Sequence, residues 1–159
     1  MLERSLSEVE ATDLYEQDFF LWTQQMATAL REGRFDQLDI ENLAEEIESV
    51  GRSEKRELAS RLRVLLIHLL KWQFQSERRS HSWQSTITEQ RIQLELVLED
   101  SPSLKGLVPD LLEGAYQQAR VKAADETQLA IATFPEQCPY ALVDVLRSDF
   151  WIDAPDVAQ

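Results

Sequence analysis

The stretch IENLAEEIESVGRSEKRELASRLRVLLIHLLKWQF, residues Ile40 to Phe74, carries the strongest signal about the fold. Its positions keep step with the period of an α-helix, about 3.6 residues per turn, on both sides of Gly51. The positions in phase are Leu43, Ile47, Gly51, Glu54, Leu58, Leu62, Leu65, Leu69 and Trp72. Because a break usually loses this register, we predict one long helix from Ile40 to Phe74 rather than two helices with a new cap at Ser53.

Further helices are predicted by the same period and by capping residues. Asp39 can cap the long helix, Gly33 suits the position just past the end of the preceding helix, and Pro109 suits a first turn. The predicted helices cover residues 13–32, 83–99, 109–127 and 139–146, and an apolar tail follows at 150–152. Strand-like alternation is scarce. The predicted fold is therefore all-α, a compact bundle of four or five helices around one long central helix.

The length of 159 residues fits one domain. We expect a single helical-bundle domain over residues 13–153, a mobile acidic N-terminal tail over 1–12 and a C-terminal tail over 154–159. No apolar run approaches the about 20 residues of a membrane span, and the polar N-terminus has no signal-peptide core. A single cysteine excludes an internal disulfide framework. These features predict a cytoplasmic, acidic protein of bacterial type that acts without a membrane.

The charge is unevenly distributed along the chain. A net charge of −13 argues against nucleic acid as a partner. Nevertheless, residues 51–91 contain nine Lys/Arg and four Glu, a local excess of +5. One interpretation is internal complementarity, in which this basic segment packs beside acidic helices or is solvated. The other is a binding surface for an acidic protein partner or a small anion.

Two residues of the basic segment stand out because of their apolar neighbours. His68 lies at the margin of the apolar face of the long helix, where an imidazole can act as a general acid or base or as a ligand. It can equally be a structural histidine bonded to a neighbouring helix. Arg91 occupies an inner stripe between Ile87 and Leu94, so it must be paired or hold an anion. The commoner solution is a buried pair, for which Glu45, Glu46 and Glu48 are the natural partners.

Other candidates complete the set. Glu41, Glu45 and Glu48 are spaced to share one helix face, which is either a solvated surface or a carboxylate set for Mg²⁺ or Mn²⁺. Candidate anion-binding residues are Lys71, Arg78, Arg79 and Arg91. The sequence has no His-Glu-x-x-His, no Glu-x-x-His pair for a di-iron site and no glycine-rich phosphate loop. No metal ligand set is assigned, and the nature of any cofactor stays open.

Four stretches resemble one bacterial family. They are DLYEQDFFLW at 13–22, LDIENLAEEIESVGRSEKRELASRLRVLLIHLLKWQF at 38–74, ERRSHSWQSTITEQR at 77–91 and FPEQCPYALVDVLRSDFW at 134–151. Together they look like the family called domain of unknown function twenty-nine, short helical proteins common in cyanobacteria. The resemblance implies an all-α fold and a cytosolic setting. It transfers no catalytic role to any residue.

Two functions are compatible with these observations. The first is a protein-interaction module, able to form homo-oligomers, whose basic central segment docks an acidic partner. The second is a metal-assisted hydrolase or phosphotransfer-type enzyme on an anionic substrate. In that enzyme Glu45 or Glu48 would be metal ligand or base, His68 the acid or base, and Arg91 and Lys71 the anion clamps. The enzyme requires His68, Arg91 and a glutamate from 41–48 to meet at an open cleft. A closed polar network would instead indicate a structural role.

Overall fold

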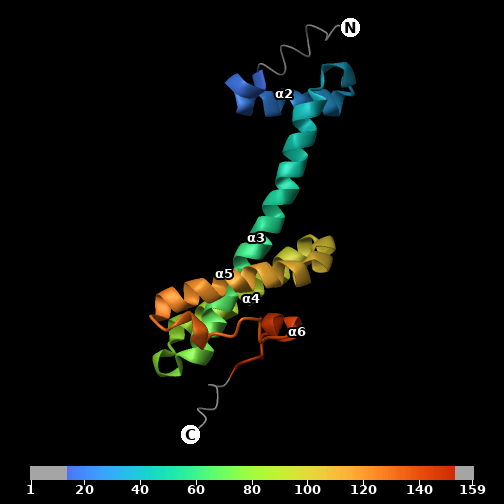
Figure 1. Ribbon diagram of the computed structural model, residues 1–159. Coiled ribbons are helices and arrows are strands. Elements are labelled where there is room, and N and C mark those ends of the chain that lie inside the picture. Colours follow the sequence, from blue (N-terminus) through green and yellow to red (C-terminus); the bar gives the residue numbers. More distant parts are fainter. Residues whose placement is uncertain (1–13, 153–159) are drawn as a thin grey trace. The chain divides into compact units, whose positions relative to one another are not determined.

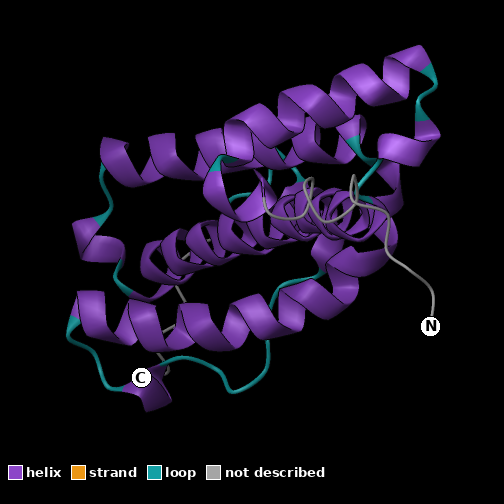
Figure 2. Cartoon of the chain, turned by 90° about the horizontal axis from the view of Figure 1, so that it is seen from above, coloured by secondary structure: helices purple, strands orange, loops and turns teal. Residues whose placement is uncertain are grey.

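The structure is a computed structural model that describes residues 14–152. All regular structure in this range is helical, without a strand, as Figure 2 shows. The all-α prediction is therefore confirmed. The chain divides into two compact units, Met1–Ser53 and Glu54–Gln159. The tails predicted for 1–12 and 154–159 lie outside the described residues, and the single domain predicted for 13–153 stays a prediction that local exchange measurements can test.

The long helix is the element that belongs to both units. Helix α3 runs without interruption over Ile40–Phe74, as predicted (Figure 1). Asp39 directly precedes the helix, and its carboxylate accepts hydrogen bonds from the backbone and the side-chain amide of Asn42 at 3.4 and 2.7 Å. Gly51 is helical, and no described atom lies within 4 Å of the position that a Cβ would take there. Gly51 is thus neither a break nor a point of close approach.

Unit 1 contains helix α2, Phe19–Glu32, and the short 3-10 helix η1, Phe35–Gln37, besides the first part of α3. Residues 14–17 are helical as well, but the helix predicted over 13–32 is interrupted at Asp18, which caps α2 and accepts a hydrogen bond from the Leu21 backbone at 2.9 Å. Gly33 ends the helix in the left-handed conformation, with φ of 70°. The prediction missed the interruption at Asp18, and the predicted end of the helix is confirmed.

The core of unit 1 is small. Trp22 and Met26 are buried, and partly buried apolar side chains surround them. The surrounding residues are Leu14, Tyr15, Leu38 and Leu43. The Tyr15 hydroxyl donates to Glu46 Oε1 at 2.6 Å, which links the segment before α2 to α3. This hydrogen bond, together with burial and the charge of Glu46, raises the pKa of Tyr15 to about 12.

Unit 2 contains the second part of α3 and all later elements. These are η2 (Ser76–Arg78), α4 (His81–Asp100), η3 (Pro102–Leu107), α5 (Val108–Thr127), η4 (Ile131–Thr133) and α6 (Leu142–Leu146). Helix α4 begins before the predicted residue 83 because Ser80 caps it and accepts from the Trp83 backbone at 3.2 Å. Helix α6 is shorter than predicted, five residues instead of a helix from 139. None of the helices described here is long and apolar enough to cross a membrane.

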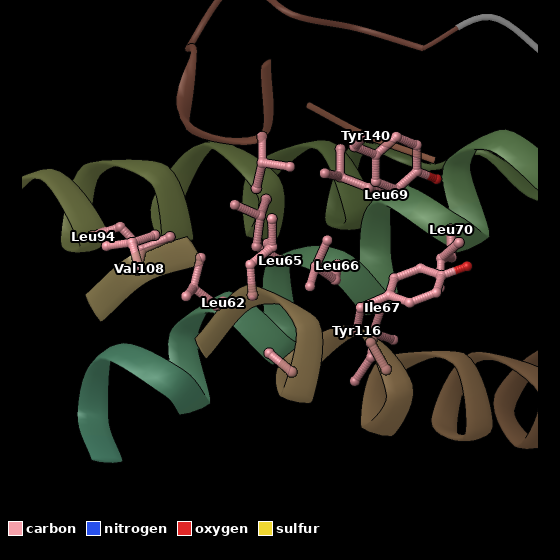
Figure 3. Close-up of a cluster of buried hydrophobic side chains, with 14 of the residues drawn as sticks. Leu62, Leu65, Leu66, Ile67, Leu69, Leu70, Leu94, Val108, Tyr116 and Tyr140 are labelled. Carbon is pink, nitrogen blue, oxygen red and sulfur yellow. The ribbon is translucent and has the colours of Figure 1, made fainter. Parts of the chain in front are cut away.

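Leucines of α3 form the centre of unit 2, and α4 and α5 pack around them (Figure 3). Leu62, Leu65 and Leu69 are fully buried, and burial of such a side chain contributes about 1.5–3 kcal/mol. Small residues of α5 complete the core as predicted, with Ala119 fully buried. The predicted apolar tail also packs here, because the Trp151 ring lies 5.1 Å from that of Trp72.

Candidate functional site

The candidate residue His68 lies in a groove between α3 and α5. The groove has a volume of about 960 Å³. Val64, Ile67 and Val121 form its apolar part, and His68 lines it from α3. Its polar lining residues are Arg63, Gln117, Gln118, Lys122, Asp125 and Glu126. The sequence placed His68 at the margin of the apolar face of its helix, and the half-buried ring occupies that position.

The hydrogen bond of His68 determines which ring nitrogen carries the proton. Nδ1 lies 2.9 Å from the carbonyl oxygen of Val64, one turn earlier on α3. A carbonyl can only accept, so we assign the proton to Nδ1, and Nε2 of the neutral ring is an acceptor. Burial lowers the pKa of His68 from its usual 6.5; the Val64 bond opposes this, and the charge of Lys71 adds to it. The imidazole is therefore neutral at pH 7.

Lys71 is not available as an anion clamp in this arrangement. Its ammonium donates to Glu126 Oε2 at 2.8 Å and lies 4.7 Å from the centre of the Trp83 ring. The side chain is 11% exposed, and Glu126, at 34%, borders the groove. The charge of Lys71 is thus already compensated by a carboxylate of α5, as the interpretation of internal complementarity requires.

Arg91 is buried, as its apolar neighbours indicated, but its partners differ from the prediction. Nε donates to the carbonyl oxygen of Val145 at 2.9 Å, and Nη2 donates to that of Asp144 at 3.4 Å. The guanidinium carbon lies 5.7 Å from the centre of the Trp151 ring. The predicted pair with a glutamate of α3 is wrong, because backbone carbonyls of α6 occupy the guanidinium instead. Burial lowers the pKa of Arg91, and Asp149 partly opposes this.

A family model described as Domain of unknown function DUF29 matches residues 14–151 of the chain. The chain belongs to this family. No curated protein and no solved structure matches it. The match covers the resemblance noted in the sequence, and the family's description assigns no activity. Roles for residues of this DUF29 chain must therefore be argued from its own contacts.

The remaining arginine candidates of the DUF29 chain differ from each other in environment. Arg79 donates to the carbonyl oxygens of Trp72 and Ile152 at 2.8 and 3.0 Å, so it connects the end of α3 to the apolar tail. Its guanidinium also lies 4.8 Å from the centre of the Trp72 ring. Arg78 is exposed, and its side chain makes no hydrogen bond or ion pair within residues 14–152. Of the two, only Arg78 is free to meet a partner.

Glu45 and Glu48 lie in unit 1 and do not line the groove of His68. Both accept from Arg52, at 2.6 Å for Glu45 and 3.5 Å for Glu48. Within the described range, no group of three or more His, Cys, Asp or Glu side chains could hold a metal ion. Arg91 lines a different cavity from His68. The meeting of His68 and Arg91 at one cleft, which the enzyme hypothesis requires, is therefore not found in unit 2.

Sequence reasoning missed an exposed apolar stripe on the DUF29 chain. Ile40, Ile47 and Val50 are 67, 71 and 64% exposed, although Ile47 was expected on the inner face of the long helix. Leu43, between them in sequence, is partly buried against the small core of unit 1. Periodicity identifies the apolar face of a helix and does not reveal what covers it. The available signal was the crowding of glutamates around these residues in ENLAEEIESV.

Proposed function

We propose that this DUF29 chain is a protein-interaction module whose unit 1 binds a basic amphipathic helix of a partner. The observation that carries the proposal is the exposure of Ile47 and Val50 on an otherwise acidic part of α3. Helices in proteins gain most of their stability from packing of an apolar face. A contiguous apolar face that stays exposed marks an interaction surface. We call Ile40, Leu43, Ile47 and Val50 the apolar stripe.

The spacing of the apolar stripe supports a helical partner. Its residues follow one another at intervals of three, four and three, which is the a/d pattern by which two helices pack along a seam. A helix that recognises another helix in this way supplies side chains at the same intervals. Unit 1 also exposes aromatic side chains on α2, where Phe19 and Phe20 are 49 and 74% exposed. Such residues are enriched at the centres of interfaces.

The charge of unit 1 supports a basic partner. Its described residues, 14–53, contain three arginines and nine Asp/Glu, a net charge of −6. An approaching helix with lysines or arginines beside its apolar face would meet a surface of opposite sign. A second copy of the same unit would bring the same negative charge. Charge therefore favours a different protein over self-association through this stripe.

The acidic partner expected from the basic segment has less support. Arg52, Arg61 and Lys71 form ion pairs with glutamates of the same unit, while Arg79 and Arg91 bond to carbonyl oxygens. Arg63 donates to Gln118 at 3.1 Å. Of the basic side chains in residues 51–91, only those of Lys55, Arg56 and Arg78 make no hydrogen bond or ion pair in the part of the chain that the structure describes. Six of the nine basic side chains are thus held within the fold, three of them by glutamates.

The interaction proposal is preferred to the hydrolase because of where the candidate catalytic side chains lie. His68 and Arg91, which the hydrolase needs at one cleft, line separate cavities of unit 2. Nε2 of His68 is an acceptor nitrogen in the groove between α3 and α5. Glu126, a carboxylate that lines the same groove, is already paired with Lys71. The cations proposed as clamps already have partners within the fold.

The experiment uses the full chain and two synthetic helical peptides of equal length. One combines leucine with lysine and the other combines leucine with glutamate, both with a/d spacing. Titration calorimetry should show saturable binding of the basic peptide only. The double variant Ile47→Gln, Val50→Gln keeps every charge and should weaken binding by about tenfold or more, because it removes apolar burial.

The matched control is Val143→Gln, since Val143 in α6 is as exposed as Val50, at 64%. This variant should bind the basic peptide like the wild type. Tighter binding of the acidic peptide, or equal binding by the double variant, would contradict the proposal. A change in the sedimentation of the chain alone on mutation of the stripe would identify a second copy as its occupant instead.

A further inference from the structure

Arg91 is a buried cation without a bound carboxylate. The residue is 4% exposed, and both of its hydrogen-bond partners are neutral carbonyl oxygens of α6. Its third nitrogen, Nη1, is buried and has no hydrogen-bond partner. Buried polar groups are nearly always hydrogen-bonded, and buried charges are normally paired with an opposite charge. Arg91 departs from both rules, because Nη1 has no acceptor and no carboxylate is hydrogen-bonded to its guanidinium among the described residues.

A cavity of about 560 Å³ lies against this residue, in unit 2. Two more cations line it, Lys105 of η3 and Arg147, which follows α6. Both oxygens of Asp149 accept from Arg147, at 2.9 and 3.1 Å, so these two charges largely compensate each other. Lys105 is exposed, and its side chain makes no hydrogen bond or ion pair within the described range. The cavity thus combines an unpartnered buried guanidinium nitrogen with an unpaired ammonium.

We propose that this cavity binds a small oxyanion, a carboxylate or a phosphate group, at the guanidinium of Arg91 and the ammonium of Lys105. Guanidinium groups hold such oxygens by short charge-assisted hydrogen bonds, and a lysine adds a second point charge. The cavity also exposes the carboxylates of Glu95 and Glu99. These two negative charges disfavour a polyanion, so the cavity favours a ligand of low charge. The inference concerns unit 2 and does not depend on the partner proposed for unit 1.

The experiment titrates the full chain with inorganic phosphate and, separately, with acetate, at ionic strength held constant with NaCl. The readouts are the thermal unfolding midpoint and the NMR signal of the Arg91 Nε–H group. A saturable shift of that signal, with a rise of the midpoint, is expected for at least one anion. Response to phosphate alone assigns a phosphoryl ligand, response to acetate alone assigns a carboxylate, and response to both assigns the shared oxyanion chemistry.

Lys105→Gln is the variant that tests the site without disturbing the core, because Lys105 is exposed. It should weaken the anion response by about tenfold. Lys122→Gln changes an equally exposed lysine that lines the groove of His68, and should leave the response as in the wild type. The proposal is overturned if neither anion gives a saturable shift, or if Lys105→Gln responds like the wild type.

Discussion

Nδ1 of His68 is bonded to the carbonyl oxygen of Val64, four residues earlier on the same helix, at 2.9 Å. The ring therefore takes its orientation from its own helix rather than from a neighbouring one, which was the structural alternative considered from the sequence. This hydrogen bond holds the imidazole at the edge of the groove. Nε2 is the ring nitrogen that does not take part in the bond. The neutral ring and its environment lead to a pH-dependent prediction.

Stability should fall when the solution is acidified below about pH 6.5. The pKa of His68 is lowered in the folded state, chiefly by burial, so the unfolded chain binds the proton more readily. The contribution of the neutral ring to the free energy of unfolding is complete above pH 6.5, the pKa of the unfolded chain. It is lost as the pH falls toward the lower pKa of the folded protein. Urea denaturation of the wild type and of His68→Gln at pH 7.5 and 5.5 measures this. The difference between the two proteins should depend on pH in this window, and a constant difference would contradict the assignment.

Replacement of Gly51 by alanine should stabilise the protein by about 0.5–1 kcal/mol. Gly51 is helical and exposed, and an added Cβ meets no atom within 4 Å, so alanine only reduces the backbone entropy lost on folding. Gly33→Ala is the matched comparison. Its backbone has φ of 70°, which alanine adopts at a cost, so this variant should be destabilised by about 1 kcal/mol. Denaturation midpoints decide, and a destabilised Gly51→Ala protein would indicate two helices in solution rather than one.

Loss of the Tyr116 hydroxyl should cost about 1–2 kcal/mol. The hydroxyl donates to the carbonyl oxygen of Pro135 at 2.6 Å, and the residue is fully buried, so Tyr116→Phe leaves an acceptor unpaired away from water. Burial also raises the pKa of Tyr116 to about 12. The pKa of Tyr15 is also raised to about 12, so spectrophotometric titration should show more than one tyrosine that ionises above pH 11. The amplitude of this step should fall by the contribution of one tyrosine in the variant. An unchanged titration curve would assign the high value to another tyrosine.

Amide protons in the two parts of α3 should exchange at very different rates. Residues 44–57 are exposed or half-buried, whereas Leu62, Leu65, Leu66 and Leu69 are fully buried. Local opening costs little where few contacts are lost, so residues 44–57 should exchange at least about a hundred times faster than residues 62–70. Hydrogen exchange followed by NMR measures this directly. Uniform protection along α3 would favour the single cooperative domain predicted for residues 13–153.

The bounds of a helix could be predicted from the sequence wherever residues within that helix determine where it begins and ends. The register across Gly51 and the small residues of α5 depend on spacing within a segment, so α3 and α5 were predicted almost to the residue. Caps that were not considered, Asp18 and Ser80, account for the errors at the starts of α2 and α4. The errors are local because a cap acts only on the turn that follows it.

The candidate site was harder to predict because its partners come from distant parts of the chain. The neighbours of Arg91 showed that it is buried, but a guanidinium accepts carboxylates and carbonyls alike as partners. Its hydrogen bonds reach Val145, 54 residues away, and no pattern near Arg91 indicates that residue. In the same way, Lys71 meets Glu126 across 55 residues. Spacing along one helix reports that a charge is buried and not which group compensates it.

The attachment of α6 to Arg91 has a consequence for the order of folding. A helix of five residues is too short to be stable in water by itself. The conformational entropy lost in helix nucleation exceeds the free energy gained from one turn of hydrogen bonds. Helix α6 therefore forms only after α4 is in place and Arg91 can bond to the carbonyl oxygens of α6. We expect this step to be among the last on the folding pathway. Mutations within α6 should accelerate unfolding and leave the refolding rate unchanged.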